Sequence, residues 1–88
     1  MFAATPAPPY TVVLGLGRSG VGAARLLHQQ GERVLVLESG SAESLQQKAQ
    51  ALQDEGIAVQ LGVPLQADTI EQLPAAPSRV IVLSLIHI

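Results

Sequence analysis

Four short apolar runs, separated by segments with helical patterning, constrain the fold of this 88-residue chain more than any other feature. The runs cover residues 10–15, 33–38, 57–62 and 79–83. The first, second and fourth are nearly continuous in Val, Leu and Ile, which is typical of parallel strands covered on both faces. The third alternates apolar residues with small or polar ones, which favours a half-exposed strand at a sheet edge.

The segments between these runs have apolar residues at helical spacing: 19–30, 41–55 and about 66–73. Gly31 and Gly56 follow the first two segments, where a left-handed C-terminal residue belongs, and Ser41 could cap the second. Strands that alternate with helices imply a parallel sheet with right-handed crossovers. The sequence therefore predicts an α/β fold, a Rossmann-like open sheet in β-α-β-α-β-α-β order with strand order 3-2-1-4, which leaves the third strand at an edge.

Length and composition limit the classes of protein to consider. A chain this short forms at most one small domain, which we place at residues 10–82 behind a disordered, proline-containing arm over residues 1–9. A net charge of −2 and only one Phe and one Tyr argue against nucleic-acid binding. No apolar run could span a bilayer, and no cysteine is present for disulfides or thiolate metal sites. We expect a cytoplasmic monomer with no nucleic-acid or membrane partner.

A glycine-rich hexad joins the first apolar run to the first helical segment. It fits G-x-G-x-x-G and consists of Gly15, Leu16, Gly17, Arg18, Ser19 and Gly20. The N-terminus of a helix offers unpaired N–H groups and the positive end of the helix dipole to a phosphate. Because the hexad lies between a strand and a helix, we expect it to bind phosphate. A glycine-rich turn that binds nothing is the alternative.

Each residue of the hexad has a distinct expected role. Gly15 permits the tight turn, Gly17 removes a Cβ where a ligand approaches, and Gly20 lets the helix pack closely. Arg18 opposes the helix dipole unless an anionic ligand is near, the alternative being a guanidinium extended into water. Ser19 donates its hydroxyl to the ligand or caps the helix.

Glu38 ends the second strand, twenty-one residues after Gly17. A carboxylate at this position in dinucleotide folds accepts hydrogen bonds from a ribose diol and disfavours a 2′-phosphate. The alternative is an exposed carboxylate at a strand end, and Ser39 adds a second polar group beside it. We find no paired carboxylates and no nucleophile with a base, so we assign no catalytic residue and no metal ligand.

Two consecutive segments carry a specific resemblance: VVLGLGRSGVGAARLLHQQGERVLVLE and ESGSAESLQQKAQALQDEGIAVQLG. Over about residues 10–82 the chain resembles the N-terminal domain of the Mur ligase family, which typically has G-L-G-x-[ST]-G and a second strand ending in an acid. The resemblance implies that this domain holds the UDP moiety of a nucleotide-sugar substrate. By position, it places Arg18 and Ser19 at the nucleotide, and Glu38 and Ser39 on the pair that contacts the uracil end. Glu stands here where Asp is more usual.

The resemblance also implies an activity for the complete enzyme. That activity is the ATP-dependent addition of D-glutamate to UDP-N-acetylmuramoyl-L-alanine in the synthesis of cell-wall peptidoglycan. ATP and Mg²⁺ would be bound in a further domain with a P-loop, so we expect this chain by itself to bind substrate without catalysis. Two alternatives stay open: the N-terminal part of an NAD-dependent dehydrogenase, and a stand-alone nucleotide-binding module.

The final residues break the family pattern. Residues 83–88 read LSLIHI, where these ligases continue with a loop of S-P-G type. This segment back-translates to CTG TCT CTT ATA CAC ATC, the start of a transposase end sequence used in DNA library preparation. We therefore interpret residues 83–88 as a non-native sequencing-adapter tail and the Rossmann-like domain as truncated; the alternative is a natural apolar strand tail.

Overall fold

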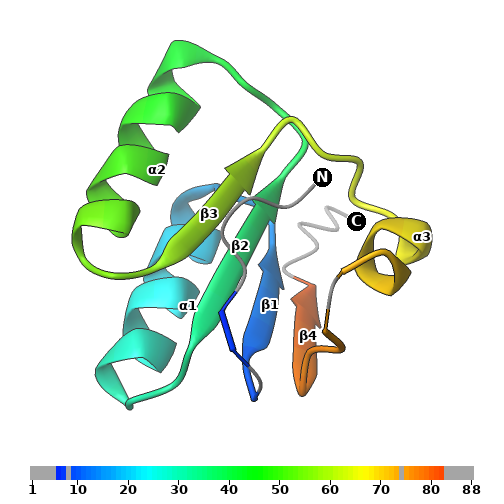
Figure 1. The fold of residues 1–88 in the computed structure, drawn as a ribbon. Coiled ribbons are helices and arrows are strands. Elements are labelled where there is room, and N and C mark those ends of the chain that lie inside the picture. Colours follow the sequence, from blue (N-terminus) through cyan, green and yellow to red (C-terminus); the bar gives the residue numbers. More distant parts are fainter. Residues whose placement is uncertain (1–5, 8, 74, 83–88) are drawn as a thin grey trace, which may run out of the picture.

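Strands and helices alternate along residues 6–7, 9–73 and 75–82, the part of the chain that this computed structural model describes (Figure 1). The strands are β1 (Thr11–Leu14), β2 (Val34–Glu38), β3 (Ala58–Leu61) and β4 (Arg79–Val82). The helices are α1 (Arg18–Gln29), α2 (Glu43–Asp54) and α3 (Ala67–Glu71). Residues 83–88 and most of the arm over residues 1–9 lie outside the described residues, so the expectations for them stay predictions.

The strands form one parallel sheet in the order β3-β2-β1-β4, which confirms the predicted fold and strand order. β1 pairs with β2 on one side and with β4 on the other. Steps from β1 to β2 and from β2 to β3 run in the same direction, so right-handed crossovers place α1 and α2 on one face. The connection from β3 returns across the sheet and places α3 on the opposite face (Figure 1).

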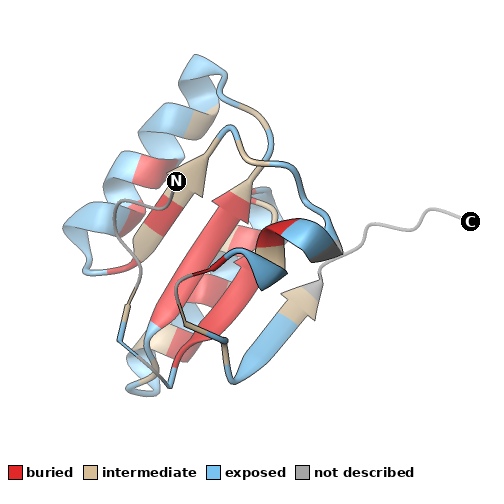
Figure 2. Cartoon of the chain, turned by 45° about the vertical axis from the view of Figure 1, so that its right-hand side comes forward, coloured by how far each residue is buried: buried red, intermediate tan, exposed pale blue. Residues whose placement is uncertain are grey.

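Both faces of the sheet carry an apolar core. On one face Val13 and Val36 pack with buried residues of α1 and α2. On the other face Val12, Leu35 and Leu37 pack with Leu73 and other residues near α3. Successive residues of a strand point to opposite faces, so a central strand with two cores needs a nearly continuous apolar sequence. Figure 2 shows this burial along β1 and β2, while the outer sides of α1 and α2 are exposed.

The C-terminal ends of α1 and α2 agree with the predictions from the sequence, but their N-terminal ends do not. Gly31 and Gly56 have φ of +87° and +96°, as predicted for left-handed residues after α1 and α2. α2 is capped by Ala42 and not by Ser41, because the Ala42 carbonyl accepts the first helical N–H groups, from Leu45 and Gln46. Among the described residues, no side chain caps the N-terminus of α1 or α2.

We predict that Gly20→Ala destabilises the chain by about 3 kcal/mol, the upper end of overpacking costs. A Cβ at Gly20 would lie 2.0 Å from the backbone oxygen of Gly15. This backbone atom cannot move aside as the end of a flexible side chain could. Gly22→Ala is the matched control on the same helix, because a Cβ there meets no atom within 4 Å. This control should stabilise α1 by about 0.5–1 kcal/mol. Urea unfolding measures both, and equal effects of the two changes would contradict the proposed close approach.

Candidate functional site

The glycine loop, residues 15–17, leaves β1 at the carboxyl edge of the sheet. Gly15 has φ of +107°, a conformation that favours glycine, and its N–H donates to the Leu37 carbonyl at 2.7 Å. The Gly15 carbonyl lies where a Cβ at Gly20 would be. The close approach predicted for Gly20 is therefore an approach to Gly15, the first residue of the glycine loop. Gly15 and Gly20 together allow the tight turn between β1 and α1.

The N-terminus of α1 presents backbone donors to this edge. Gly17 is the N-cap residue, with extended backbone angles, and Val21 N–H donates to its carbonyl at 2.9 Å. The first turn of α1 contains no acidic residue. The first N–H groups of a helix have no intrahelical acceptor, and with the helix dipole they favour an anion. A Cβ at Gly17 would meet no atom of the described chain within 4 Å, so an added side chain there would face open space.

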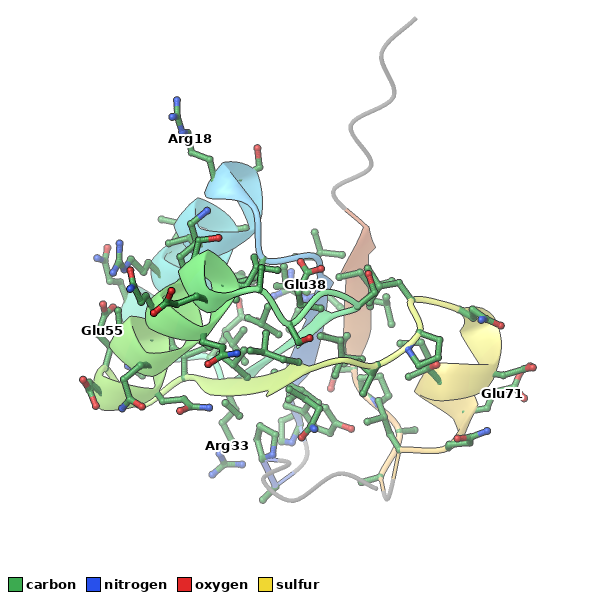
Figure 3. The ribbon with its side chains drawn as sticks, turned by 90° about the horizontal axis from the view of Figure 1, so that it is seen from above. Arg18, Arg33, Glu38, Glu55 and Glu71 are labelled. Atoms are coloured by element: carbon green, nitrogen blue, oxygen red, sulfur yellow. The ribbon has the colours of Figure 1, made fainter. Side chains whose placement is uncertain are left out.

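Arg18 and Ser19 form the exposed start of α1. Ser19 is the second residue of the helix and Gly17 holds the N-cap position, so of the two alternatives for Ser19 the one in which it caps α1 is wrong. Figure 3 shows the Arg18 side chain extending outward from the start of α1.

A shallow groove of about 500 Å³ between α1 and α2 is lined by Arg18, Arg25 and Lys48 among others. Arg25 pairs with Glu55 at 2.7 Å.

Glu38 is partly buried at the end of β2, and both of its carboxylate oxygens accept backbone hydrogen bonds. Oε1 accepts from the N–H of Leu16 at 2.7 Å, and Oε2 accepts from the N–H of Gly40 at 2.9 Å. The hydroxyl of Ser39, an exposed residue, lies 3.5 Å from Oε2. Figure 3 looks down on this edge and shows Glu38 near the centre of the chain. The structure thus joins Glu38 to the glycine loop, and it does not leave Glu38 as an exposed carboxylate.

The environment of Glu38 favours its ionised form. Burial raises the pKa of the Glu38 carboxyl, but hydrogen bonds from Gly40, Leu16 and Ser39 together lower the pKa below its ordinary value. The carboxylate is therefore ionised at neutral pH. Its charge strengthens the hydrogen bonds from Leu16 and Gly40, because N–H donors bind a charged acceptor more strongly than a neutral one.

A further loop joins the same cluster through the backbone. The N–H of Val63 donates to the Glu38 carbonyl at 3.1 Å, and the N–H of Gly62 donates to the Gly40 carbonyl at 3.2 Å. Beside this loop lies a pocket of about 680 Å³ whose lining includes Gln66 and Thr69. Sequence reasoning missed Gly40 and the β3–α3 loop as part of this edge. The E-S-G sequence that begins with the last residue of β2 was the available signal, because it marks a turn in which the Gly40 N–H faces back toward the Glu38 carboxylate.

Two kinds of feature are absent from the described part of the chain. No three His, Asp or Glu side chains gather there in an arrangement that could hold a metal ion. None of the described helices is long and apolar enough to cross a membrane.

The fold and the edge define a Rossmann-like domain with a glycine loop and a strand-end acid. The chain belongs to the TrkA-N domain family, which matches residues 11–86. It is also similar to UDP-N-acetylmuramoylalanine–D-glutamate ligases, which confirms the resemblance seen in the sequence. Identity is 56% over 61 residues for the ligase of Synechococcus sp. (strain CC9902), which is 69% of this chain and 13% of that protein.

Two other relatives carry the same name. Identity is 47% over 72 residues for Parasynechococcus marenigrum (strain WH8102), or 82% of this chain and 16% of the relative. It is 51% over 69 residues for Prochlorococcus marinus (strain MIT 9313), or 74% of this chain and 15% of the relative. The chain therefore spans only 13–16% of the length of these ligases. No solved structure matches the chain.

We predict that Glu38→Gln lowers the free energy of unfolding at neutral pH by about 1 kcal/mol or more, because one of the two bonded backbone N–H groups then faces an amide NH₂ and the other keeps only a neutral acceptor. The pKa of Glu38 is lower in the folded chain than its ordinary value of 4.5, so the unfolded chain binds the proton first as the pH falls. The stability difference between the two proteins should therefore be complete above pH 4.5 and disappear as the pH falls through the lowered pKa.

Thermal unfolding at a series of pH values measures this difference. Glu71→Gln is the control, because Glu71 is an exposed residue and its replacement removes the same charge. A difference between the Glu38 variant and the unmodified chain that stays constant down to acidic pH would contradict the prediction.

Proposed function

We propose that this chain is the UDP-binding part of an ATP-dependent ligase that adds D-glutamate to UDP-N-acetylmuramoyl-L-alanine in peptidoglycan synthesis. One observation carries the proposal: the glycine loop places the N-terminus of α1, which no side chain caps, beside Glu38. The similarity to ligases of that name supports the choice of a UDP-sugar over other nucleotides. The proposed substrate-binding residues are Gly15, Leu16, Gly17, Arg18, Ser19, Gly20, Glu38 and Ser39.

The proposed binding mode follows from the donors at this edge. The diphosphate approaches past Gly17, where the backbone is open, and accepts hydrogen bonds from the first N–H groups of α1. Arg18 is exposed beside these groups and adds a positive charge, and the Ser19 hydroxyl is a further donor. The uridine end lies toward Glu38 and Ser39, whose polar atoms flank the loop after β2.

The remaining chemistry belongs to the complete ligase. ATP, Mg²⁺ and D-glutamate are proposed as its cofactors and second substrate, and a cytoplasmic monomer is the proposed state. We derive no step of amide formation from the residues of this chain, which on this proposal binds substrate only.

We predict that UDP-N-acetylmuramoyl-L-alanine and UDP stabilise the 88-residue chain, whereas NAD does not. A ligand that binds only the folded state adds about 2.7 kcal/mol of stability at 100 times its Kd. The melting temperature of the chain with each ligand gives the ranking, and calorimetric titration gives the affinities. Stabilisation by NAD without stabilisation by UDP would instead favour the dehydrogenase alternative.

Gly17→Val should abolish binding of UDP while the chain stays folded. A Cβ at Gly17 would meet no atom of the described chain within 4 Å, so we expect the Val side chain to cost the fold little while it fills the space through which the phosphates approach. Gly22→Ala, which adds a side chain farther along α1, should leave UDP affinity unchanged. Circular dichroism and UDP titration of both variants measure fold and binding separately. A Gly17→Val chain that binds UDP normally would place the phosphates elsewhere.

A further inference from the structure

We infer that Glu38 is a positioning residue: its carboxylate joins the glycine loop to the β2–α2 loop and so fixes the direction in which the N-terminus of α1 faces a phosphate. The inference rests on the proposed function of this edge in nucleotide binding. It assigns to Glu38 a role that acts through the backbone, in addition to the contact with a ligand that its position suggests.

The glycine loop is held from two sides at Leu16. The Leu16 side chain is fully buried and packs in the core formed with α1 and α2, which includes Val13 and Ala24. Its N–H donates to Glu38 Oε1 at 2.7 Å. The side chain thus anchors the loop to the core, and the hydrogen bond fixes the orientation of the peptide group that precedes Leu16. Two residues farther on, α1 begins.

The second oxygen of Glu38 is equally well defined. Oε2 accepts from Gly40 N–H at 2.9 Å, and a Cβ at Gly40 would lie 3.4 Å from this oxygen and 2.6 Å from Cδ1 of Leu45. Gly40 therefore allows the β2–α2 loop to close over the carboxylate. The Glu38 carbonyl accepts from Val63, so the β3–α3 loop is fixed to the same residue.

This geometry gives a physical reason for Glu where the family pattern more often has Asp. The carboxylate must reach from the end of β2 to the N–H of Leu16 in the neighbouring loop and still face Gly40. An Asp side chain is one methylene shorter, so we expect it not to reach both N–H groups in this backbone. The partner atoms of the longer side chain are the two backbone nitrogens.

The hydrogen bonds of Glu38 also determine which backbone N–H groups are available to a ligand. The N–H of Leu16 is bonded to Glu38, so Leu16 contributes to the proposed site by fixing the loop, and the first N–H groups of α1 remain to meet the phosphate. A carboxylate close to the site repels a diphosphate, which by itself would weaken binding. An ordered loop offsets this repulsion because ligand binding then does not include the entropic cost of ordering it. Removal of the Glu38 charge therefore raises UDP affinity if Glu38 only repels, and lowers it if Glu38 positions the loop.

The first test uses the ¹⁵N-labelled chain without any ligand. Amide hydrogen exchange of the unmodified chain is compared with Glu38→Gln, Glu38→Asp and the charge control Glu71→Gln. We expect the amides of Leu16 and Gly40 to exchange about tenfold faster in both Glu38 variants, the size expected when a hydrogen bond to a charged acceptor is lost. Core amides of β1, such as that of Val13, and all amides of the control should keep their rates.

The second test is UDP affinity of the same four proteins at neutral pH. We expect about tenfold weaker binding in both Glu38 variants and no change in Glu71→Gln. Glu38→Asp is the decisive variant, because it keeps a carboxylate that could meet a ligand hydroxyl but cannot hold both loops. Normal UDP binding by Glu38→Asp, or unchanged exchange at Leu16 and Gly40, would overturn the positioning role.

The two proposals can fail separately. If the unmodified chain does not bind UDP, the proposed function is wrong, whatever the exchange rates show. If UDP binds but the exchange of Leu16 and Gly40 does not depend on Glu38, only the positioning role is wrong. If the variants do not fold, the unmodified chain still decides: the amide shifts of Leu16 and Gly40 should move together as the pH falls, with a midpoint below the ordinary pKa of glutamate. Independent or absent titration of these two amides would overturn the positioning role.

Discussion

The parallel register between β1 and β2 is the constraint on which the rest of the structure depends. Leu14 pairs with Leu37, and the N–H of Gly15 continues this ladder to the Leu37 carbonyl at 2.7 Å. Just beyond this pair lie Leu16 on one side and Glu38 on the other, so the contact between them follows from the register. A shift of the register by one residue would exchange the two faces of the sheet and lose both cores. The core and the site are therefore fixed by the same pairing.

The polar groups at the amino ends of the strands are satisfied differently from those at the carboxyl ends. We call these two sides of the sheet its amino edge and its carboxyl edge. At the amino edge side chains make the connections: the Tyr10 hydroxyl donates to the Ala75 carbonyl, and Glu32 binds both the Thr11 hydroxyl and Arg79. These contacts fix the start of β1 and join β4 to the chain before β2. At the carboxyl edge the first N–H groups of α1 have no side-chain cap, and Glu38 binds N–H groups of the two neighbouring loops. Within the described residues, the carboxyl edge is therefore the one that offers backbone donors to an anion, and it is where parallel α/β sheets usually bind ligands.

Sequence patterns predicted most of the fold because each signal was local. Continuous apolar runs indicated strands buried on both faces, and the alternating third run indicated the edge strand β3. Gly31 and Gly56 marked helix ends by their conformational freedom. The N-caps were harder to predict, because Ser19 and Ser41 are good capping residues whose positions depend on where the preceding turn ends. The partners of Glu38 lie 22 residues back and two residues on, and only the register brings the first of them into reach.

On the proposed function, the glycine loop binds a phosphate but cannot by itself select the nucleotide, since every diphosphate offers the same oxygens to the N–H groups of α1. Selection must come from groups that meet the base and the sugars. In the proposed binding mode those groups lie on the loops after β2 and β3, and Glu38 is bonded to both loops through its carboxylate and its carbonyl. The residue that orients the phosphate donors thus also places the loops that would face the rest of the ligand. On this proposal, a substitution that lengthens or shortens the Glu38 side chain alters affinity and selectivity together.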